Sequence, residues 1–259
     1  MNIAIPEKAQ QTVQKTIKTT AHRGASSLAP ENTLAAFMKA AELGCDWIEI
    51  DVQLSLDKVP MVIHDRTVDR CSNGSGAVAE LALSSLKQLD AGQWFGQAFT
   101  EERIPTLAET LCLAKKNNLK VNIELKLYPQ DDVQVLCERI SEVITESQCI
   151  DTQLLFSSFN AEALKRMQNL QPQIRRGQLW EKIPTDALAN LKEIDAYSVH
   201  CDYRFLTERQ AQQLKQSDYQ LYCYTPNQPA LVEQHWGWGV DMMITDKPQA
   251  YRAILAYAS

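Results

Sequence analysis

The chain has 259 residues, of which 45% are hydrophobic and 22% charged, and its formal net charge is −6. This is ordinary globular composition, and 9 glycines with 10 prolines are too few for a collagenous or low-complexity chain. The acidic balance argues against a protein whose main partner is nucleic acid, because a phosphate backbone recruits an excess of lysine and arginine.

Strand-like and helix-like segments alternate from about residue 18 to the end of the chain. We expect strands at residues 19–22, 47–54, 59–64, 120–127, 153–157, 174–179, 196–199, 219–224 and 241–244. We expect helices at residues 33–43, 107–117, 132–146, 161–169, 185–191, 208–216, 229–236 and 248–257. Such alternation implies parallel strands joined by crossover helices. Roughly eight such units suit a (β/α)8 TIM barrel better than an open sheet.

One long segment interrupts this alternation. Between Asp65 and Thr106 the chain carries turn signals (CSNGSG, AGQWFG) and only a short helical piece. A connection of that length is usually functional, and in a barrel it would sit at the carboxyl end of a strand, where active sites are built. We therefore predict a single domain over residues 1–259, with the barrel at 18–257. Residues 66–105 are the predicted insertion, which follows the third strand and lies over the active site.

The N-terminus and the cysteines predict the location. The first 20 residues carry Gln, Lys and Thr throughout and lack the apolar core of a signal peptide. No run approaches the ~18 apolar residues that a membrane span needs. The seven cysteines are scattered, odd in number and without a CxxC pair, which favours reduced thiols over a disulfide framework. We expect a cytoplasmic protein without stable membrane association.

Two of the predicted strands carry charged residues on one face. Side chains alternate along a strand, so Glu49 and Asp51 fall opposite the aliphatic residues of the second strand, and Glu124 and Lys126 do so on the fourth. An antiparallel sheet with one wet face explains this period by itself. In a barrel, however, the aliphatic face meets the helices and the charged face points inside.

Three carboxylates in a barrel interior need compensation. Burying unpaired carboxylates costs several kcal/mol each, and one lysine cannot neutralise three of them. A set of carboxylates without a Cys or His cluster suits a hard divalent ion such as Mg²⁺ or Ca²⁺. We predict that Glu49, Asp51 and Glu124 bind one such ion; the alternative for each is a solvated strand carboxylate.

Histidine and arginine occur at the same strand ends. A lone histidine there is usually structural, but His22 and His64 both end predicted strands beside the carboxylates, which favours a pair that transfers protons. Arg23 and Gly24 follow His22 at once. Arginine suits bidentate contact with phosphate, and glycine lets the backbone approach closely.

Together these residues resemble the ordered motifs of glycerophosphodiester phosphodiesterases. The motifs are His22-Arg23-Gly24, Pro30-Glu31-Asn32-Thr33, Glu49-Ile50-Asp51-Val52, His64-Asp65 and Glu124-Leu125-Lys126. The resemblance runs from about residue 19 to 255 and includes the insertion and the closing strands. It departs from the family at Pro226 in Tyr-Thr-Pro-Asn, at Cys71 and at Lys58, none of which is a predicted ligand.

The resemblance implies a barrel that uses a divalent metal to hydrolyse glycerophosphodiesters, such as glycerophosphocholine and glycerophosphoethanolamine, to sn-glycerol 3-phosphate and an alcohol. His22 and His64 would be the general acid and base, in an order that the sequence leaves open, as it does the nucleophile: water or a glycerol hydroxyl. Five residues would contact the phosphate or the rest of the substrate: Arg23, Lys126, Glu31, Tyr224 and Asn227. Asn32 has two interpretations, a neighbour of the metal site or the N-cap of the first helix.

Alternative functions keep the same fold. A lysophospholipase D or phospholipase-like enzyme would use the metal site on lipids, but the acidic net charge and the lack of a basic amphipathic segment disfavour it. A barrel that only binds a phosphorylated ligand would typically have lost a ligand or a histidine. A homodimer is left open.

Overall fold

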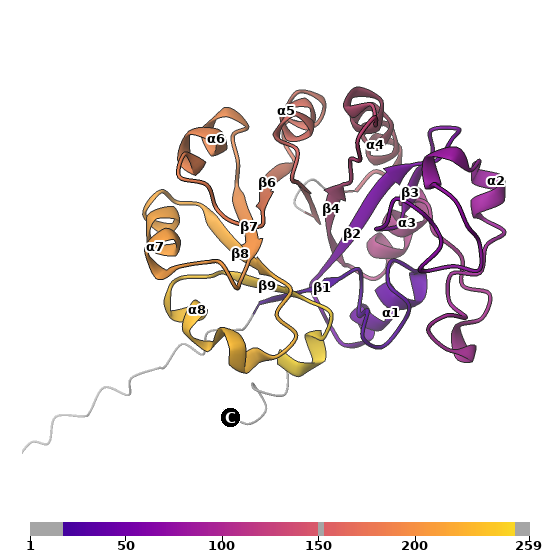
Figure 1. Ribbon diagram of the computed structural model, residues 1–259, viewed down its shortest axis with the longest axis horizontal. Helices are drawn as coiled ribbons and strands as arrows, with labels where there is room; N and C mark the ends of the chain where they lie inside the picture. Colours follow the sequence, from indigo (N-terminus) through magenta and orange to yellow (C-terminus); the bar gives the residue numbers. More distant parts are fainter. Residues whose placement is uncertain (1–17, 150–152, 252–259) are drawn as a thin grey trace, which may run out of the picture.

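The computed structural model of the protein describes residues 18–149 and 153–251. Within them, eight parallel strands close into a barrel, and helices lie around its outside (Figure 1). The barrel strands are β1 (Thr19–His22), β2 (Trp47–Leu54), β4 (Lys120–Leu125), β5 (Leu154–Ser158), β6 (Arg175–Trp180), β7 (Ser198–Asp202), β8 (Gln220–Tyr224) and β9 (Met242–Thr245). Because β1 pairs with both β2 and β9, the ring is complete. The predicted TIM barrel is confirmed.

The outer helices follow the prediction closely. They are α1 (Leu34–Glu42), α3 (Leu107–Lys116), α4 (Val133–Ser147), α5 (Ala161–Leu170), α6 (Ala187–Glu193), α7 (Glu208–Gln216), and the 3-10 turn η4 (Pro229–Val232) that leads into α8 (Glu233–Gly237). The helix predicted at 248–257 lies partly outside the described residues. None of the helices in the described part of the chain is long and apolar enough to cross a membrane.

Hydrophobic packing on one face of β2 determines which side chains enter the barrel. Ile48, Ile50 and Val52 are fully buried and belong to the same apolar cluster as residues of α1 and α3. A register shift of one residue would exchange the two faces of the strand, so this packing fixes the register. It therefore holds Glu49 and Asp51 on the interior face.

The third predicted strand is the main correction to the expected order of elements. The sequence predicts a strand at 59–64 that ends at His64, but β3 (Pro60–Val62) is shorter, runs antiparallel to β2 and lies outside the barrel. Only residues 55–59 connect the two strands, and a parallel neighbour needs a crossover of a dozen or more residues. His64 consequently lies in the loop after β3. The side-chain amide of Gln53 donates to the carbonyls of Ile63 and Asp65 and anchors this loop.

The segment after β3 forms a small apolar core of its own. It contains η1 (Val78–Glu80), α2 (Leu83–Leu86) and η2 (Gln97–Phe99), and the cluster beneath them includes Met61, Val68 and Leu86. Among its aromatic residues, Phe95 contacts Trp94 and Phe99 edge to face, with ring centroids 5.6 and 5.4 Å apart.

Candidate active site

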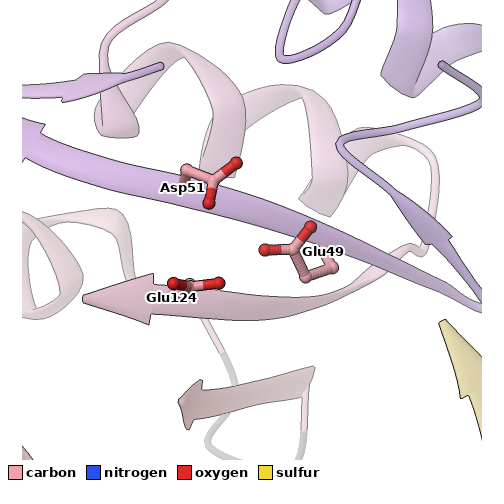
Figure 2. Close-up of side chains that lie close together, drawn as sticks. All are labelled: Glu49, Asp51 and Glu124. Carbon is pink, nitrogen blue, oxygen red and sulfur yellow. The ribbon is translucent and has the colours of Figure 1, made fainter. Parts of the chain in front are cut away.

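The three predicted metal ligands meet inside the barrel. The register of β2 and β4 places Asp51 beside Glu124 and Glu49 beside Asn122, so the three acidic side chains share the interior face. One oxygen from each of Glu49, Asp51 and Glu124 lies within 4.8 Å of the others, and the carboxyl groups turn toward one another (Figure 2). Glu49 and Asp51 are almost completely buried.

The charges of this cluster are only partly balanced. Burial, together with Asp51 and Glu124, raises the pKa of Glu49 well above its ordinary value. Burial would also raise the pKa of Asp51, but Lys126 and Arg23 outweigh it and lower that pKa to about 2. Their nitrogens lie 3.5 Å and 3.3 Å from its oxygens. Burial raises the pKa of Glu124, although Lys126 at 2.8 Å opposes the shift.

Two buried oxygens of the cluster suit a cation. Glu49 Oε1 and Asp51 Oδ1 accept no hydrogen bond from the described residues. A buried acceptor without a hydrogen bond is costly. Asp51 Oδ1 has only the Lys126 ammonium at 3.5 Å, and a divalent ion would satisfy both oxygens at once. The donor set consists of carboxylate oxygens, which Mg²⁺ and Ca²⁺ prefer. Glu49, Asp51 and Glu124 therefore fit a hard divalent cation.

Metal affinity is expected to rise with pH. The raised pKa values of Glu49 and Glu124 mean that these groups hold protons in the metal-free protein above the usual carboxyl range, and a cation must displace them. Each proton released would tighten binding by up to about tenfold per pH unit below the raised pKa, whereas Asp51 contributes nothing there. Titration calorimetry with Mg²⁺ from pH 5 to 8, in buffers of different ionisation enthalpy, measures this release. A flat affinity without proton release would contradict it.

His22 faces the cluster and is oriented by a carboxylate from the last strand. Its Nε2 lies 3.9 Å from Glu49, and its Nδ1 lies 2.6 Å from Asp246, which follows β9. Ser26 and Asn227 also donate to Asp246. Burial alone would raise the pKa of Asp246, but His22, Asn227 and Ser26 together outweigh it and lower that pKa to about 2. Since a carboxylate must accept the Nδ1 proton, Nε2 is the nitrogen left for chemistry.

His64 is held by an analogous pair that reaches into the insertion. Its Nδ1 lies 2.7 Å from Asp65. The Arg70 guanidinium binds Asp65 at 2.5 and 3.0 Å and, on its other edge, Glu31 at 2.7 and 2.8 Å. The hydrogen bond from Arg70 holds the pKa of Asp65 well below its ordinary value. The Tyr128 hydroxyl donates to the His64 carbonyl and fixes the loop.

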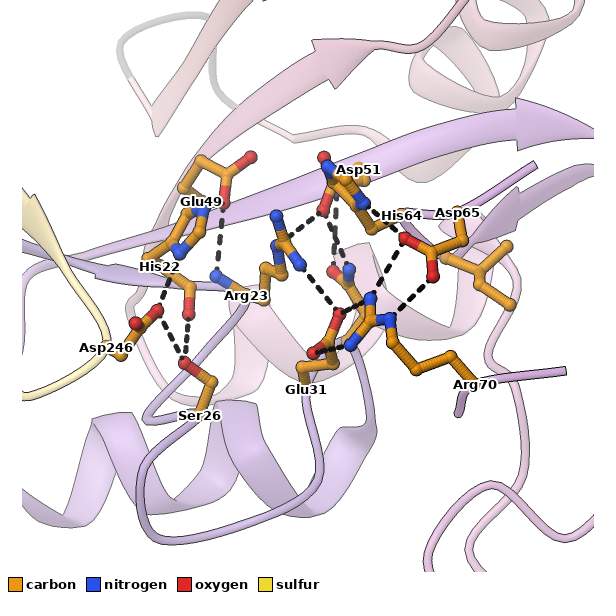
Figure 3. A network of polar contacts seen from close by, with 12 residues as sticks. His22, Arg23, Ser26, Glu31, Glu49, Asp51, His64, Asp65, Arg70 and Asp246 are labelled. Atoms are coloured by element: carbon orange, nitrogen blue, oxygen red, sulfur yellow. Dashed lines mark hydrogen bonds and ion pairs between the residues drawn. The ribbon is translucent and has the colours of Figure 1, made fainter. Parts of the chain in front are cut away.

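Arg23 connects the two histidine pairs, as Figure 3 shows. Its backbone N–H donates to Glu49 at 3.1 Å, and its side chain contacts both Asp51 and Glu31. The residue has a φ of 55°, and the following Gly24 has a φ of 81°. A Cβ at Gly24 would come within 2.7 Å of α1, so only glycine fits this turn.

Asn32 is a neighbour of the carboxylate cluster. Its side-chain nitrogen donates to Asp51 at 2.8 Å, and its φ is 55°. The N-cap of α1 is Thr33, whose hydroxyl accepts from Ala36 N–H. Of the two interpretations of Asn32, the cap is wrong, because the left-handed backbone turns its side chain into the barrel.

Three other predicted substrate residues occupy different places. Tyr224 lines a cavity of about 270 Å³ that is also lined by His22 and His64. Its hydroxyl donates to the Trp180 carbonyl. Glu31 lies behind Arg23, where it binds two arginines. The side-chain amide of Asn227 donates to the Asp246 carboxylate and accepts from the Asp246 N–H. Asn227 does not line this cavity.

Sequence reasoning missed three residues that orient the predicted site: Asp65, Arg70 and Asp246. Asp65 had a local signal, since it directly follows His64. Asp246 follows the last strand, and closure of a barrel brings that strand beside the first. Arg70 lies in irregular structure, where strand period gives no signal; Asp69-Arg70 is part of the family resemblance in the insertion, but that resemblance assigned it no role.

Several known proteins are similar to this chain in fold and in sequence. The model of the glycerophosphoryl diester phosphodiesterase family matches residues 22–250. A glycerophosphodiester phosphodiesterase of Caldanaerobacter subterraneus subsp. tengcongensis is 38% identical over 88% of this chain and 93% of its own length. One from Bacillus subtilis is 31% identical over 92% and 86%. A phosphodiesterase of Oleispira antarctica, solved with its product sn-glycerol-3-phosphate, is 35% identical with a TM-score of 0.89 and covers 92% of this chain and 96% of its own.

Fold and sequence together define a TIM-barrel hydrolase of phosphodiesters. The chain belongs to the glycerophosphoryl diester phosphodiesterase family, and the resemblance in its motifs is thereby confirmed.

Proposed function

We propose that the protein hydrolyses glycerophosphodiesters, with glycerophosphocholine and glycerophosphoethanolamine as candidates, to sn-glycerol 3-phosphate and an alcohol. One observation carries the proposal: two histidine–aspartate pairs face a buried, incompletely neutralised carboxylate cluster across one cavity. The product bound in the Oleispira phosphodiesterase supports the same reaction. Glu49, Asp51 and Glu124 would hold one Mg²⁺ or Ca²⁺, which would supply Lewis-acid stabilisation of charge on the phosphate.

The protein's own residues divide the rest of the chemistry. One imidazole removes the proton of the attacking hydroxyl, which forms a new P–O bond, and the other protonates the alkoxide released when the old P–O bond breaks. Asp246 and Asp65 keep His22 and His64 in the orientation that this exchange needs. Arg23 and Lys126 line the cavity and offer positive charge to the phosphate oxygens.

The wider predictions belong to the same proposal. We propose that residues 1–259 act as one domain in which residues 66–105 complete the site, supported by the contacts of Arg70 with Asp65 and Glu31. A cytoplasmic location is supported by the lack of any disulfide among the described residues. The oligomeric state, which the sequence leaves open, stays open.

A coupled assay for sn-glycerol 3-phosphate release tests the function. The full chain would be assayed with glycerophosphocholine, glycerophosphoethanolamine and lysophosphatidylcholine, with Mg²⁺, with Ca²⁺ and with excess chelator. We expect release from the water-soluble diesters only, lost in chelator and restored by the metal. Full activity in chelator would refute the metal role, and cleavage of the lysolipid alone would favour the lipid alternative.

Arg70→Ala should lower kcat by about 10- to 100-fold, the usual cost of losing a group that orients a site residue. Arg70→Lys should recover little, because a single ammonium cannot bridge two carboxylates as the planar guanidinium does. Stability should change little, since Arg70 is 46% exposed. Arg103→Ala, in the same insertion, is the matched control, because its guanidinium donates to the Gln88 carbonyl and lies near Asp90 rather than near Asp65 or Glu31. Equal kcat values for Arg70→Ala and this control would refute the positioning role.

A further inference from the structure

A second cavity lies at the amino ends of the barrel strands, at the opposite end of the barrel from the candidate active site. Its volume is about 500 Å³, against about 270 Å³ for the cavity that His22 and His64 line. The first residues of several strands line it, among them Trp47 of β2, Lys120 of β4 and Arg175 of β6. We call it the amino-end cavity. The proposed mechanism uses none of its residues.

An apolar layer inside the barrel separates the two cavities. Leu155, Tyr222, Met242 and Ile244 are buried and form one hydrophobic cluster. The first three line the amino-end cavity, whereas Ile244 lines the cavity of the candidate active site. The amino-end cavity is therefore a separate place with an apolar floor, and a ligand bound there would not touch the histidines or the carboxylate cluster.

Positive charge is concentrated on the wall of the amino-end cavity, although the chain as a whole has a net charge of −6. Lys18, Lys120 and Arg175 line it. Among the residues that the structure describes, none of these three forms an ion pair. Of the two aspartates on the wall, Asp241 is already bound at 2.5 Å by a lysine of α7, and Asp46 is exposed. Three cations thus stand against one unpaired carboxylate.

Aromatic rings support two of these cations. Lys120 Nζ lies 5.8 Å from the centroid of the Trp47 ring, and the guanidinium carbon of Arg175 lies 4.2 Å from that of Tyr197. Both rings pack against the apolar layer, and they come from opposite sides of the barrel, where β2 and β7 lie. Because the N–H donors of a guanidinium lie in its plane, contact through its face leaves them available to an anion.

The wall and the floor of this cavity select different parts of one ligand. Lysine and arginine offer only hydrogen-bond donors, and arginine binds phosphate in a bidentate manner. The apolar layer and the two rings favour a flat apolar group beside the anion. A volume of about 500 Å³ is within the range of about 300–1,000 Å³ that is usual for small-molecule sites.

We propose that the amino-end cavity binds an organic phosphate that carries a flat ring, such as a mononucleotide, as a second ligand site of the protein. Lys18, Lys120 and Arg175 hold the phosphate, and the ring of the ligand lies on the apolar layer. The inference does not rest on the proposed function, because the two cavities share no residue.

Equilibrium binding of three probes tests this inference. The full chain, freed of divalent ions by dialysis, is titrated calorimetrically with adenosine 5′-monophosphate (AMP), with ribose 5-phosphate, which lacks the base, and with adenosine, which lacks the phosphate. We expect AMP to bind with a Kd below about 1 mM and at least about tenfold more tightly than either fragment, because only AMP uses both the cations and the apolar layer. A lack of saturable AMP binding, or equal affinity for AMP and ribose 5-phosphate, would overturn the inference.

Variants locate the bound nucleotide. Arg175→Ala and Lys120→Ala should each weaken AMP binding by about tenfold or more, the usual loss for a hydrogen bond to a charged group. Lys116→Ala is the matched control, since this lysine is exposed at the end of α3 and does not line the cavity, and it should leave AMP affinity unchanged. An unchanged midpoint of thermal unfolding shows that a variant is folded. If Lys120→Ala fails this criterion, the exposed Arg175 decides the result.

Two outcomes would contradict the site rather than the ligand. Equal AMP affinity in the wild type and in Arg175→Ala would place the nucleotide elsewhere on the protein. Residues 1–17 and 252–259 join the described part of the chain at Lys18 and Tyr251, which both line the cavity, so the full chain is the necessary sample. If either segment occupies the cavity, AMP will not bind and the inference is wrong. The proposed function fails separately, in the assay for sn-glycerol 3-phosphate release, which none of these titrations uses.

Discussion

Glu49→Gln should make the metal-free protein more stable and should abolish its stabilisation by Mg²⁺ or Ca²⁺. The pKa of Glu49 is raised by burial and by two neighbouring carboxylates, so its ionised form is unfavourable in the folded state. A neutral amide of the same shape removes that repulsion and still offers an oxygen to Arg23 N–H. We expect a gain of about 1–3 kcal/mol in the metal-free free energy of unfolding near neutral pH.

The sign of this effect depends on pH. A group whose pKa is raised in the folded state contributes most stability below its unfolded pKa, and that contribution is lost as pH rises through the folded value. The gain from Glu49→Gln should therefore vanish near pH 4 and grow above it. Calorimetric unfolding with chelator across this range measures the gain. Activity should fall by about 10³-fold, because the substitution removes a ligand of the cation that stabilises the transition state.

Asp51→Asn is the informative contrast, because it should destabilise the same metal-free protein. Asp51 keeps a low pKa through Lys126 and Arg23, so its loss leaves two buried cations with one anionic partner fewer. Breaking a buried ion pair costs about 3–5 kcal/mol. Glu146→Gln, on the exposed face of α4, controls for the loss of a single charge. Equal stability changes in the two cluster variants would contradict the assignment of unequal roles.

The strands and the acidic cluster could be predicted because a period of two reports directly on which face is buried. The aliphatic residues of β2 pack on helices, so the alternating Glu49 and Asp51 had to enter the barrel. The same logic placed Glu124 on β4. The period of two does not show whether a strand runs parallel or antiparallel to its neighbour. The strand predicted to end at His64 is in fact antiparallel to β2.

Unlike Asp65, which directly follows His64, the residue that orients His22 depends on a contact that no local pattern contains. Asp246 is 224 residues from His22 and reaches it only because β9 lies against β1. Asparagine is a common N-cap residue, so the sequence allowed Asn32 to cap the first helix. In the structure its backbone is left-handed, and its side-chain amide donates to Asp51.

His22→Ala should lower kcat by about 10²- to 10⁴-fold, and Asp246→Asn by about 10- to 100-fold, with little change in KM for either. The imidazole acts on a proton in the transition state, so its removal costs rate rather than affinity. Asp246 does not line the cavity that contains both histidines, and it acts by accepting the Nδ1 proton of His22 at 2.6 Å. An asparagine there retains the shape but can present its amide to Nδ1, which would favour the wrong tautomer.

The double variant decides whether Asp246 works through His22. If it does, adding Asp246→Asn to His22→Ala should change kcat by less than about twofold, because the residue that it positions is already gone. Proton NMR supplies a second measurement, since the hydrogen-bonded Nδ1 proton of His22 should be lost in Asp246→Asn. Asp241→Asn removes a carboxylate that binds Lys215 and the Leu221 N–H near the start of β9, and should leave kcat unchanged. Multiplicative losses in the double variant would mean that Asp246 contributes to the reaction independently of His22.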